Sequence, residues 1–326
     1  MLKNLLKKIV LATFGPPVKY VISQMYIYKP VEERFQFLET MLQDAYPDEW
    51  VINERSAEEI ERIKNIFDLP QDFNTGISKN DLMFRFFIQN NFSFPEAFKA
   101  YFVRSVHFLD MISKIAEKKW GKNWQQQAYP FLDFASGYGA LERLLVHYLP
   151  ANQIYTSDIK KKGVDFQVEK FGVNGIYSSF TPEDFKTDVR FKFIFVGSLF
   201  SHLPEDLFTR WLKVLHNHLH EDGILAFTVH DTSIINSPED TVYLTASEDL
   251  TSNVVEDAIR KKESYGTMYV NEKYVKNEIA KLGVAANQYY RYEKIFCNLQ
   301  DIYVVNKQAN VFDNSITFNY YDSTKY

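Results

Sequence analysis

The sequence predicts an α/β fold in which helices cover both faces of a mostly parallel sheet, preceded by a helical N-terminal region. From about residue 128, short apolar runs rich in β-branched and aromatic residues alternate with helical stretches, as crossover connections between parallel strands require. Residues 31–125 show helical spacing instead. The composition, 46% hydrophobic and 24% charged, excludes a mainly disordered chain and a bundle of membrane helices. The 326 residues suit one large domain or two modest ones.

The first part of the chain, residues 1–30, is a basic amphipathic segment. Residues 1–14 contain lysines and apolar residues at helical spacing. Gly15-Pro16-Pro17 then ends the predicted helix. The longest apolar run, Ile9–Phe14, is too short to cross a bilayer. Two alternatives stay open: a helix docked on its own domain, or a weak membrane-surface contact through residues 1–14.

Residues 31–125 are expected to form a helical region that serves as lid and substrate pocket. The predicted helices are Glu32–Ala45, Ser56–Ile66, Asn80–Gln89 and Pro95–Lys119, and no strand run is recognisable among them. The rest of the chain is predicted to divide into a main domain, residues 126–306, with a lid insertion at about 232–270, and a C-terminal tail, residues 307–326.

Seven strands and four helices are predicted in the main domain. The strands are Tyr129–Phe134, Gln153–Ser157, Gly175–Tyr177, Phe191–Gly197, Gly223–His230, Gln288–Lys294 and Asp301–Asn306. The helices are Ala140–Leu149, Val164–Phe171, Glu205–Leu219 and Asn271–Leu282. Ligands of such sheets bind beyond the carboxyl ends of the strands, so the residues that follow each strand are the candidates for a site.

A turn of small residues, Ala135-Ser136-Gly137-Tyr138-Gly139, follows the first strand directly after Asp133. Small residues let the backbone approach a ligand closely, and the following helix presents free N–H groups. A dinucleotide fingerprint needs a third glycine three residues after the second, but Glu142 stands there, bulky and negative. S-adenosylmethionine, with an amino acid and a sulfonium but no phosphate, fits this turn better, and Asp133 can then face its ammonium group.

A second carboxylate, Asp158, ends the second strand and is followed by Ile159. A carboxylate at this position can accept hydrogen bonds from both ribose hydroxyls of an adenosine. The alternative is an aspartate that caps the next helix. Together with the turn after the first strand, Asp158 favours ribose binding.

These residues resemble the class I S-adenosylmethionine-dependent methyltransferases. Asp133, Ala135, Gly137 and Gly139 stand at the positions of motif I, and Asp158 matches the acidic residue of motif II. Ala135 replaces a more usual glycine, a change that costs little if φ is negative there.

Further stretches are similar to a bacterial subgroup of these enzymes that often accompanies glycosyltransferase and polysaccharide genes. They include Gly163–Phe166, Val196–Pro204 and Leu225–His230. One position departs from the subgroup: Ala140 stands where an arginine commonly opens the helix after motif I.

The resemblance implies a Rossmann-like, seven-stranded, mostly parallel sheet and S-adenosyl-L-methionine as cofactor. It further implies transfer of a methyl group to a small-molecule or saccharide acceptor, with oxygen as the expected nucleophile. The implied cofactor-binding residues are Asp133, Ala135, Ser136, Gly137, Gly139, Asp158, Ile159, Gly197 and Ser198.

Three residues near strand ends are candidates for catalysis. His202 follows the fourth predicted strand and could take a proton from a hydroxyl, or could only shape the loop. His230 and Asp231 end the fifth predicted strand, and because neighbours on a strand point to opposite faces, only one of them is expected to enter the site. His216, His218 and His220 cannot converge from one helix, so no metal site is predicted there and a solvated helix end is expected.

The net charge and the cysteine content indicate which partners and which cellular compartment fit this chain. A net charge of −5 argues against nucleic acid as a partner. Cys297 is the only cysteine, which fits a reducing, cytoplasmic compartment, with the inner face of a membrane as an alternative location through the N-terminal segment. Two other functions stay open: a non-catalytic Rossmann-like binding module and a nicotinamide-dependent oxidoreductase.

Overall fold

The computed structural model describes residues 49–50, 54–89, 94–245 and 265–319. The chain divides into two compact units, residues 1–101 and residues 102–326, and the division falls within helix α6 (Phe94–Trp120). The predicted N-terminal segment and the predicted helix Glu32–Ala45 lie outside the described residues.

The first unit contains α4 (Glu54–Phe67), α5 (Leu82–Gln89) and the first residues of α6, as the helical spacing predicts. The expectation of a region without strands was wrong, because β1 (Glu49–Trp50) and β2 (Ile77–Ser78) pair antiparallel. A strand of two residues is too short to show an alternating pattern in the sequence.

Asp81 fixes the start of α5. Its Oδ1 accepts hydrogen bonds from the backbone N–H groups of Met83 and Phe84, at 2.9 and 3.1 Å, and its Oδ2 accepts one from the Tyr101 hydroxyl at 2.7 Å. The Phe84 ring in turn packs edge-on against Phe98, with ring centroids 5.3 Å apart. A capping carboxylate and a small aromatic core thus hold α5 and the start of α6 together.

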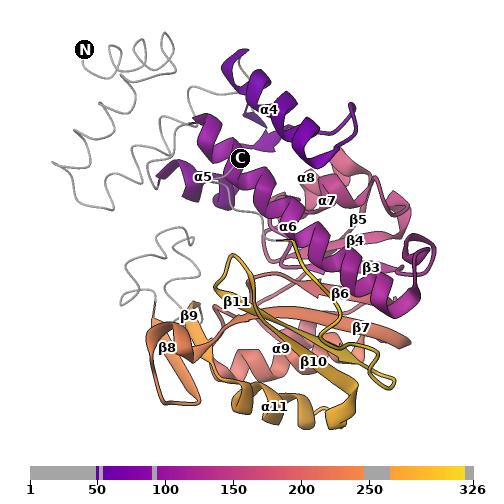
Figure 1. The fold of residues 1–326 in the computed structure, drawn as a ribbon, viewed down its shortest axis with the longest axis vertical. Coiled ribbons are helices and arrows are strands. Elements are labelled where there is room, and N and C mark those ends of the chain that lie inside the picture. The colour runs from indigo at the N-terminus through magenta and orange to yellow at the C-terminus, as the bar shows by residue number, and fades with distance from the viewer. Residues whose placement is uncertain (1–48, 51–53, 90–93, 246–264, 320–326) are drawn as a thin grey trace, which may run out of the picture. The chain divides into compact units, whose positions relative to one another are not determined.

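The second unit is built on one mixed sheet, which confirms the predicted fold class. Its strands are β3 (Phe131–Phe134), β4 (Ile154–Asp158), β5 (Asn174–Tyr177), β6 (Phe191–Val196), β7 (Leu219–His230), β8 (Thr241–Thr245), β9 (Gly266–Val270), β10 (Tyr289–Phe296) and β11 (Gln300–Asn306). Seven of them follow the order β10-β11-β7-β6-β3-β4-β5 (Figure 1). Strands β3 to β7 are parallel, and β11 lies antiparallel between β7 and β10.

The sheet has nine strands rather than the predicted seven. The additional strands β8 and β9 pair antiparallel, and β9 joins β7 through His230 and Tyr269. Both belong to the segment 232–270 that the sequence predicts to be a lid insertion. Every residue of β8 is half-buried, so the structure does not give this strand one buried and one exposed face.

The described helices that connect the strands of this unit are α7 (Glu142–Leu145), α8 (Lys161–Phe171), α9 (Glu205–Asn217) and α11 (Glu272–Ala280). Helix α7 is much shorter than the predicted Ala140–Leu149. Backbone N–H groups around it bond three residues back, as in Leu144 to Leu141 and Tyr148 to Leu145, so the predicted helix is largely a series of tight turns.

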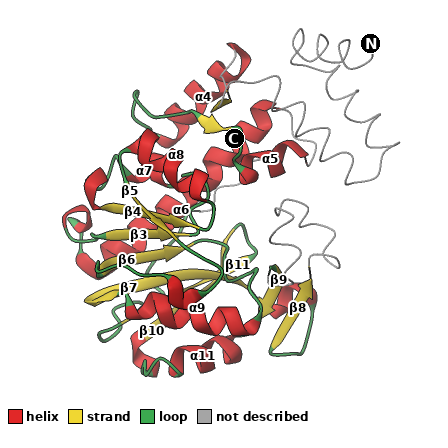
Figure 2. Ribbon diagram, turned by 180° about the vertical axis from the view of Figure 1, so that it is seen from behind, coloured by secondary structure: helices red, strands yellow, loops and turns green. Residues whose placement is uncertain are grey.

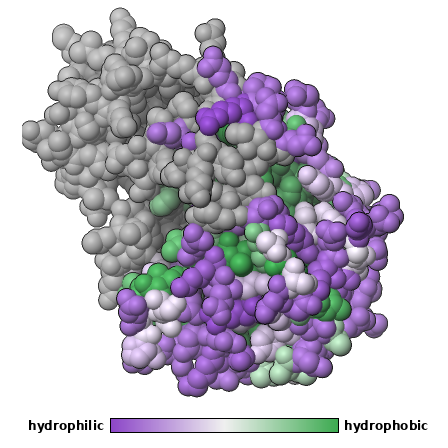
Figure 3. Space-filling view, in the orientation of Figure 1, coloured by the Kyte–Doolittle hydropathy of each residue, from purple (hydrophilic) through white to green (hydrophobic). Residues whose placement is uncertain are grey.

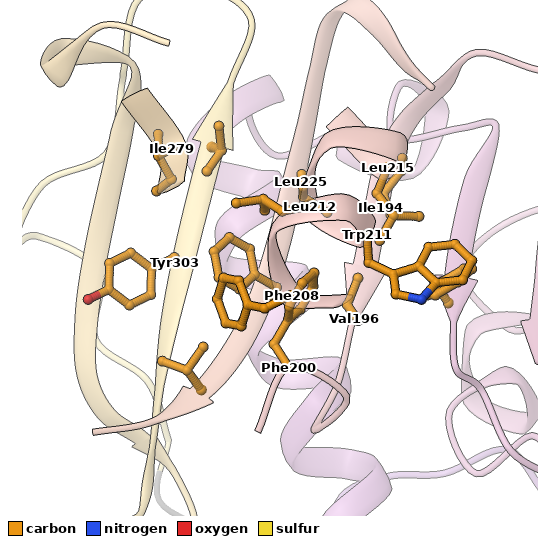
Figure 4. Packing of buried hydrophobic residues seen from close by; sticks show 14 of the residues in the cluster. Ile194, Val196, Phe200, Phe208, Trp211, Leu212, Leu215, Leu225, Ile279 and Tyr303 are labelled. Carbon is orange, nitrogen blue, oxygen red and sulfur yellow. The ribbon is translucent and has the colours of Figure 1, made fainter. Parts of the chain in front are cut away.

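The two faces of the sheet have different covers. Helices α9 and α11 lie on one face, where Phe208, Leu212 and Ile279 meet the strand residues Val196 and Tyr303 (Figures 2 and 4). The opposite face meets residues 102–120 of α6, in which Phe108 packs on Phe195 with centroids 5.1 Å apart and Trp120 lies near Phe193. Both faces are therefore buried, as a parallel sheet requires.

On the face seen in Figure 3, the surface of the described residues is mainly hydrophilic, with smaller hydrophobic patches. In the part of the chain that the structure describes, no helix combines the length and hydrophobicity needed to cross a membrane.

Candidate functional site

The strand order reverses between β3 and β6, because β3 pairs with β4 on one side and with β6 on the other. Ligands of open α/β sheets bind in the crevice beyond the carboxyl ends of the strands at such a reversal. In the register of β3 and β6, Asp133 pairs with Phe195. Ser136 lies three residues after Asp133, and Ser198 lies three residues after Phe195. The loops that follow β3 and β6 therefore leave the sheet at the same level.

The turn after β3 is fastened to the end of β4. The backbone N–H groups of Ala135 and Ser136 donate to the Ser157 carbonyl at 2.7 and 3.1 Å, and the Gly137 N–H donates to Oδ2 of Asp158 at 2.9 Å. Gly137 itself has a φ of +62°, and a Cβ built on it would meet no atom within 4 Å. The turn is therefore held by backbone hydrogen bonds, with open space over its central glycine.

Asp158 lies at the end of β4 with 8% of its surface exposed. Its Oδ1 accepts a hydrogen bond from the backbone N–H of Lys160 at 2.8 Å, while Oδ2 accepts from Gly137. The helix cap considered as an alternative to ribose binding is not formed, because the N-cap of α8 is Lys160 and no side chain caps this helix. A carboxylate oxygen can accept more than one hydrogen bond, so the two observed bonds are compatible with ligand binding. Ile159, the next residue, is half-buried.

The side chain of Gln167 on α8 forms hydrogen bonds with the turn after β3 and with β4. Its Oε1 accepts from the Thr156 hydroxyl at 2.5 Å, and its amide N–H group faces Ser136 Oγ and the Gly137 carbonyl oxygen, both at 3.0 Å. Gly163 on the same helix comes even closer, since a Cβ there would lie 2.3 Å from the Gly137 carbonyl oxygen. Neither residue was singled out for this role from the sequence, because each acts across a helix–turn contact.

Ala135 departs from the expectation of a negative φ. Its φ is +63°, in the left-handed region that favours glycine. A residue with a Cβ is strained there by about 1–2 kcal/mol. Its N–H donates to the Ser157 carbonyl on the neighbouring strand. The negative φ under which alanine would cost little at this motif position is therefore not found.

Asp133 lies beneath the turn beside Glu142, on the sheet face opposite the α9–α11 core. Asp133 is 5% exposed and Glu142 fully buried. Burial and the neighbouring Glu142 carboxyl raise the pKa of Asp133 well above its usual range. Burial also raises the pKa of Glu142, to about 7. The two acids form a buried pair in which burial and mutual repulsion disfavour the charged form of Asp133, and the contact of Asp133 with the cofactor's ammonium group stays a prediction.

Gly197 and Ser198 follow β6. A Cβ on Gly197 would lie 2.9 Å from Cζ of Phe108, so the close approach that this glycine permits is that of a ring from α6. Ser198 has a φ of +60°, and its N–H donates to the Thr228 hydroxyl on β7 at 2.8 Å. A non-glycine residue held in the left-handed region beyond a strand end is often found at a functional site.

A chain of polar side chains runs from α6 to β7 through Ser198. Arg104 Nη2 donates to Ser198 Oγ at 3.3 Å, and Ser198 Oγ donates to Gln300 Oε1 at 3.1 Å. The Gln300 amide N–H group then faces Nε2 of His230 at 3.1 Å. Nε2 of the neutral His230 ring therefore accepts, and Nδ1 carries the proton. Arg104 and Gln300 were not among the predicted site residues.

His202 lies in the loop after β6 and is held by β9. Its Nδ1 is 2.7 Å from the Gly266 carbonyl oxygen, and its ring stacks on Tyr265 with centroids 4.8 Å apart. The backbone pairs as well, with the Gly266 N–H donating to the His202 carbonyl at 3.0 Å. A carbonyl oxygen only accepts, so Nδ1 carries the proton and Nε2 holds the lone pair of the neutral ring.

Asp231 and His230 point to opposite faces, as strand alternation predicts. Asp231 Oδ1 accepts from the Ser233 N–H at 2.8 Å, and its Oδ2 pairs with Arg291 at 2.9 Å. Arg291 also binds Asp301. Asp231 is thus part of an ion-pair cluster on the face of the sheet that carries α11.

The three histidines near the end of α9 do not form a cluster. His218 bonds to the Val214 carbonyl and His220 pairs with Asp222. His216, expected at a solvated helix end, is buried, and burial lowers its pKa to about 4. The described residues contain no group of three or more His, Cys, Asp or Glu residues arranged to hold a metal ion.

No protein-family model matches the chain, and no curated protein matches it. Similar solved structures include an S-adenosylmethionine-dependent methyltransferase from Clostridium acetobutylicum, 14% identical, covering 59% of this chain and 90% of that chain with a TM-score of 0.39. The plantazolicin methyltransferase BamL in complex with a triazolic desmethylPZN analog and SAH is 10% identical, covering 78% and 97% with a TM-score of 0.46. The DhpI–SAM–HEP complex is 14% identical, covering 64% and 95% with a TM-score of 0.39. At identities this low, the likeness concerns the fold and assigns no activity to this chain.

Proposed function

We propose that this chain is an S-adenosylmethionine-dependent methyltransferase that transfers a methyl group to a small-molecule or saccharide acceptor, at oxygen. The observation that carries the proposal is the hydrogen bond between the Gly137 N–H and Asp158 at the point where the strand order reverses. This bond joins the glycine turn, residues 135–139, to the Asp158 carboxylate, and together they form a rim at the carboxyl ends of β3 and β4. Open space lies over Gly137.

This rim fits an adenosyl group. Asp158 is fixed at the end of β4 by hydrogen bonds from two backbone N–H groups, and a carboxylate in this position can accept hydrogen bonds from ribose hydroxyls. Ser136 and Gly137 are half-buried at the reversal, and the turn leaves open space over Gly137. When bound, S-adenosylmethionine supplies a methyl group on a sulfonium, whose transfer is an in-line displacement that discharges a cation. The protein's part is then to align the acceptor, exclude water and remove a proton.

His202 is the residue best suited to take the proton of an acceptor hydroxyl. The Gly266 carbonyl fixes its proton on Nδ1, which makes Nε2 the basic nitrogen. His230 uses its Nε2 for the contact with Gln300, and both Asp231 oxygens are engaged with Ser233 and Arg291. We therefore assign His202 as the general base and keep His230 and Asp231 as residues that shape the acceptor side of the site.

A nicotinamide-dependent oxidoreductase is the less favoured alternative. Close packing of helix on strand after a dinucleotide turn requires a third glycine. Here that position is Glu142, which fills the space with a buried carboxyl beside Asp133.

Calorimetric titration of the full chain with S-adenosylhomocysteine tests the proposal. We expect saturable binding to the wild-type protein and none of NAD. Asp158→Ala should weaken S-adenosylhomocysteine binding by about 1–3 kcal/mol, because ribose hydroxyls and the Gly137 N–H lose an acceptor. The matched control is Asp165→Ala, which removes an exposed carboxylate on α8. A folded wild-type protein that does not bind S-adenosylhomocysteine would refute the proposal.

A further inference from the structure

A tyrosine from β9 or its first flank lies against each of the two histidines near the site. Tyr265, which directly precedes β9, stacks on His202 with the ring centroids 4.8 Å apart and 12° between the ring planes. Tyr269, within β9, stacks on His230 at 5.5 Å and 30°. The closer and more nearly parallel of the two stacks is therefore the one on the residue that we assign as the general base.

Two contacts of different kinds hold the His202 ring. The Gly266 carbonyl oxygen, 2.7 Å from Nδ1, fixes one edge of the imidazole, and the Tyr265 ring lies against one of its faces. Because these contacts come from consecutive residues, a single backbone segment defines both the edge and the plane of the ring. Rotation of the His202 side chain would break both contacts, so the ring keeps its proton on Nδ1 and its lone pair on Nε2.

The backbone segment that carries Tyr265 is fixed on both sides. On one side, the Gly266 N–H donates to the His202 carbonyl oxygen at 3.0 Å. On the other side lies β8, since a Cβ on Gly266 would overlap the Leu244 carbonyl oxygen. The position of the Tyr265 ring is therefore set by backbone contacts of its neighbour, and the ring can in turn set the position of His202.

Tyr265 also lies near the cofactor half of the proposed site. Burial raises the pKa of the Tyr265 hydroxyl, and the neighbouring Asp158 and Tyr243 raise it further. A charge acts on a phenol in this way only from nearby. The ring that stacks on the proposed base thus also lies close to the carboxylate proposed for the ribose. Its hydroxyl stays protonated at neutral pH and adds no charge beside the imidazole.

We propose that Tyr265 is a positioning residue for His202, whose imidazole it holds in the plane that keeps the lone pair on Nε2 for the hydroxyl of the methyl acceptor. The inference rests on the proposed function and adds to it the residue through which the base is oriented. The contact is made by the face of the ring. A phenylalanine should therefore serve as well, whereas a side chain of similar volume without a flat ring should not.

Histidine-selective NMR of the full chain tests the inference and needs no methyl acceptor. At about pH 8, where an ordinary histidine is neutral, proton–nitrogen correlations show which ring nitrogen carries the proton, and His202→Ala identifies the His202 signals. We expect the Nδ1–H tautomer alone in the wild type and in Tyr265→Phe, with exchange of that proton equal within about twofold. Tyr265→Leu should show both tautomers and roughly tenfold faster exchange, the shift that loss of one aromatic pair supports.

The matched control is Tyr269→Leu, which removes the same ring from β9 but from the stack on His230. It should leave the tautomer and the exchange rate of His202 unchanged. Unshifted signals of His216 and His218, which lie at the end of α9, show that each variant is folded.

Three results would overturn the inference. One is a wild type in which His202 lacks a single Nδ1–H tautomer, and this holds whether or not the leucine variant folds. The others are a folded Tyr265→Leu that keeps the wild-type tautomer and exchange rate, and a Tyr265→Phe that shows both tautomers. Calorimetric titration with S-adenosylhomocysteine separates this inference from the proposed function: a wild type that binds the ligand while Tyr265→Leu behaves like the wild type contradicts the inference alone. A wild type with the fixed tautomer that does not bind the ligand contradicts the proposed function.

Discussion

The two halves of the rim at the carboxyl ends of the strands are built in different ways. On the β3–β4 half, backbone groups make the decisive contacts, as in the bonds from Ala135 to Ser157 and from Gly137 to Asp158. On the β6–β7 half, side chains meet one another, from Arg104 through Ser198 to Gln300. The β3–β4 half is thus a cradle shaped by the backbone of residues 135–139. The β6–β7 half is a set of polar side chains that could form further hydrogen bonds to a ligand.

This difference suggests a division of labour. A backbone cradle with glycines at positive φ sets a shape that side-chain substitution barely alters, which suits a group common to every reaction cycle, such as an adenosyl group. Polar side chains that can donate hydrogen bonds, and a histidine of defined tautomer, suit a different part of the site. This is the part that binds the methyl acceptor and where charge changes during the reaction. The β3–β4 half should therefore govern binding, and the β6–β7 half the chemistry.

The largest expected effect concerns the chemical half. His202→Ala should lower turnover by about 100- to 10,000-fold, because a positioned general base is lost. The affinity for S-adenosylhomocysteine should stay within about twofold of the wild type, since the β3–β4 half is untouched. Turnover is measured as release of S-adenosylhomocysteine in the presence of a methyl acceptor. Full activity of this variant would return His202 to a purely structural role in its contact with Gly266.

The next effect concerns the binding half. Gly163→Ala would place a Cβ 2.3 Å from the Gly137 carbonyl oxygen, so α8 and the turn must move apart. We expect about 2–4 kcal/mol lower stability in urea and a large loss of S-adenosylhomocysteine affinity. Gly172→Ala is the control, because Gly172 has a φ of +68° but open space around it. It should cost about 1 kcal/mol of stability without changing affinity.

Sequence patterns located the cradle better than the polar half. Strand ends and small residues are local signals, and they correctly placed Asp158 beside the turn of Gly137. Arg104 had a signal too, as a lone cation in an apolar stretch of helix. Its meaning depends on Ser198, which is 94 positions away, and no local pattern connects the two.

Two further features could not be predicted from local sequence patterns: the backbone conformation of Ala135 and the pairing of β8 and β9. The positive φ of Ala135 follows from a bond to the next strand, and alanine shows no preference for that region. The sequence predicts a lid insertion at about 232–270 but not the strands β8 and β9 within it, because their pairing with β7 depends on a single contact of His230 with Tyr269. Tertiary contacts decide such cases, so the β9 support of His202 emerges only from the fold.

A smaller effect tests the buried acids under the cradle. Burial raises the pKa of Glu142 from 4.5 to about 7, so protonated Glu142 stabilises the fold below about pH 4.5, and this contribution is lost as the pH rises through about 7. The free energy of unfolding should fall by about 1–3 kcal/mol between pH 5 and 8. Glu142→Gln should reduce that slope in urea titrations, and the buried Asp133, whose pKa is also raised, should retain part of it. Glu183→Gln, at an exposed acid whose pKa is lowered to about 2, should leave it unchanged.

The smallest effect compares the two halves directly, because each has one non-glycine residue at nearly the same positive φ. Ala135 has +63° and Ser198 has +60°. Ala135→Gly relieves backbone strain and removes only a methyl group, so we expect about 0.5–1 kcal/mol higher stability. Ser198→Gly gains the same relief but leaves Arg104 and Gln300 without their shared hydroxyl, which should cancel or reverse the gain. Urea unfolding of both variants measures the difference. Equal stabilisation by the two substitutions would mean that the Ser198 hydroxyl contributes nothing to the fold, and that the polar half is held by packing of Phe108 and Phe296 alone.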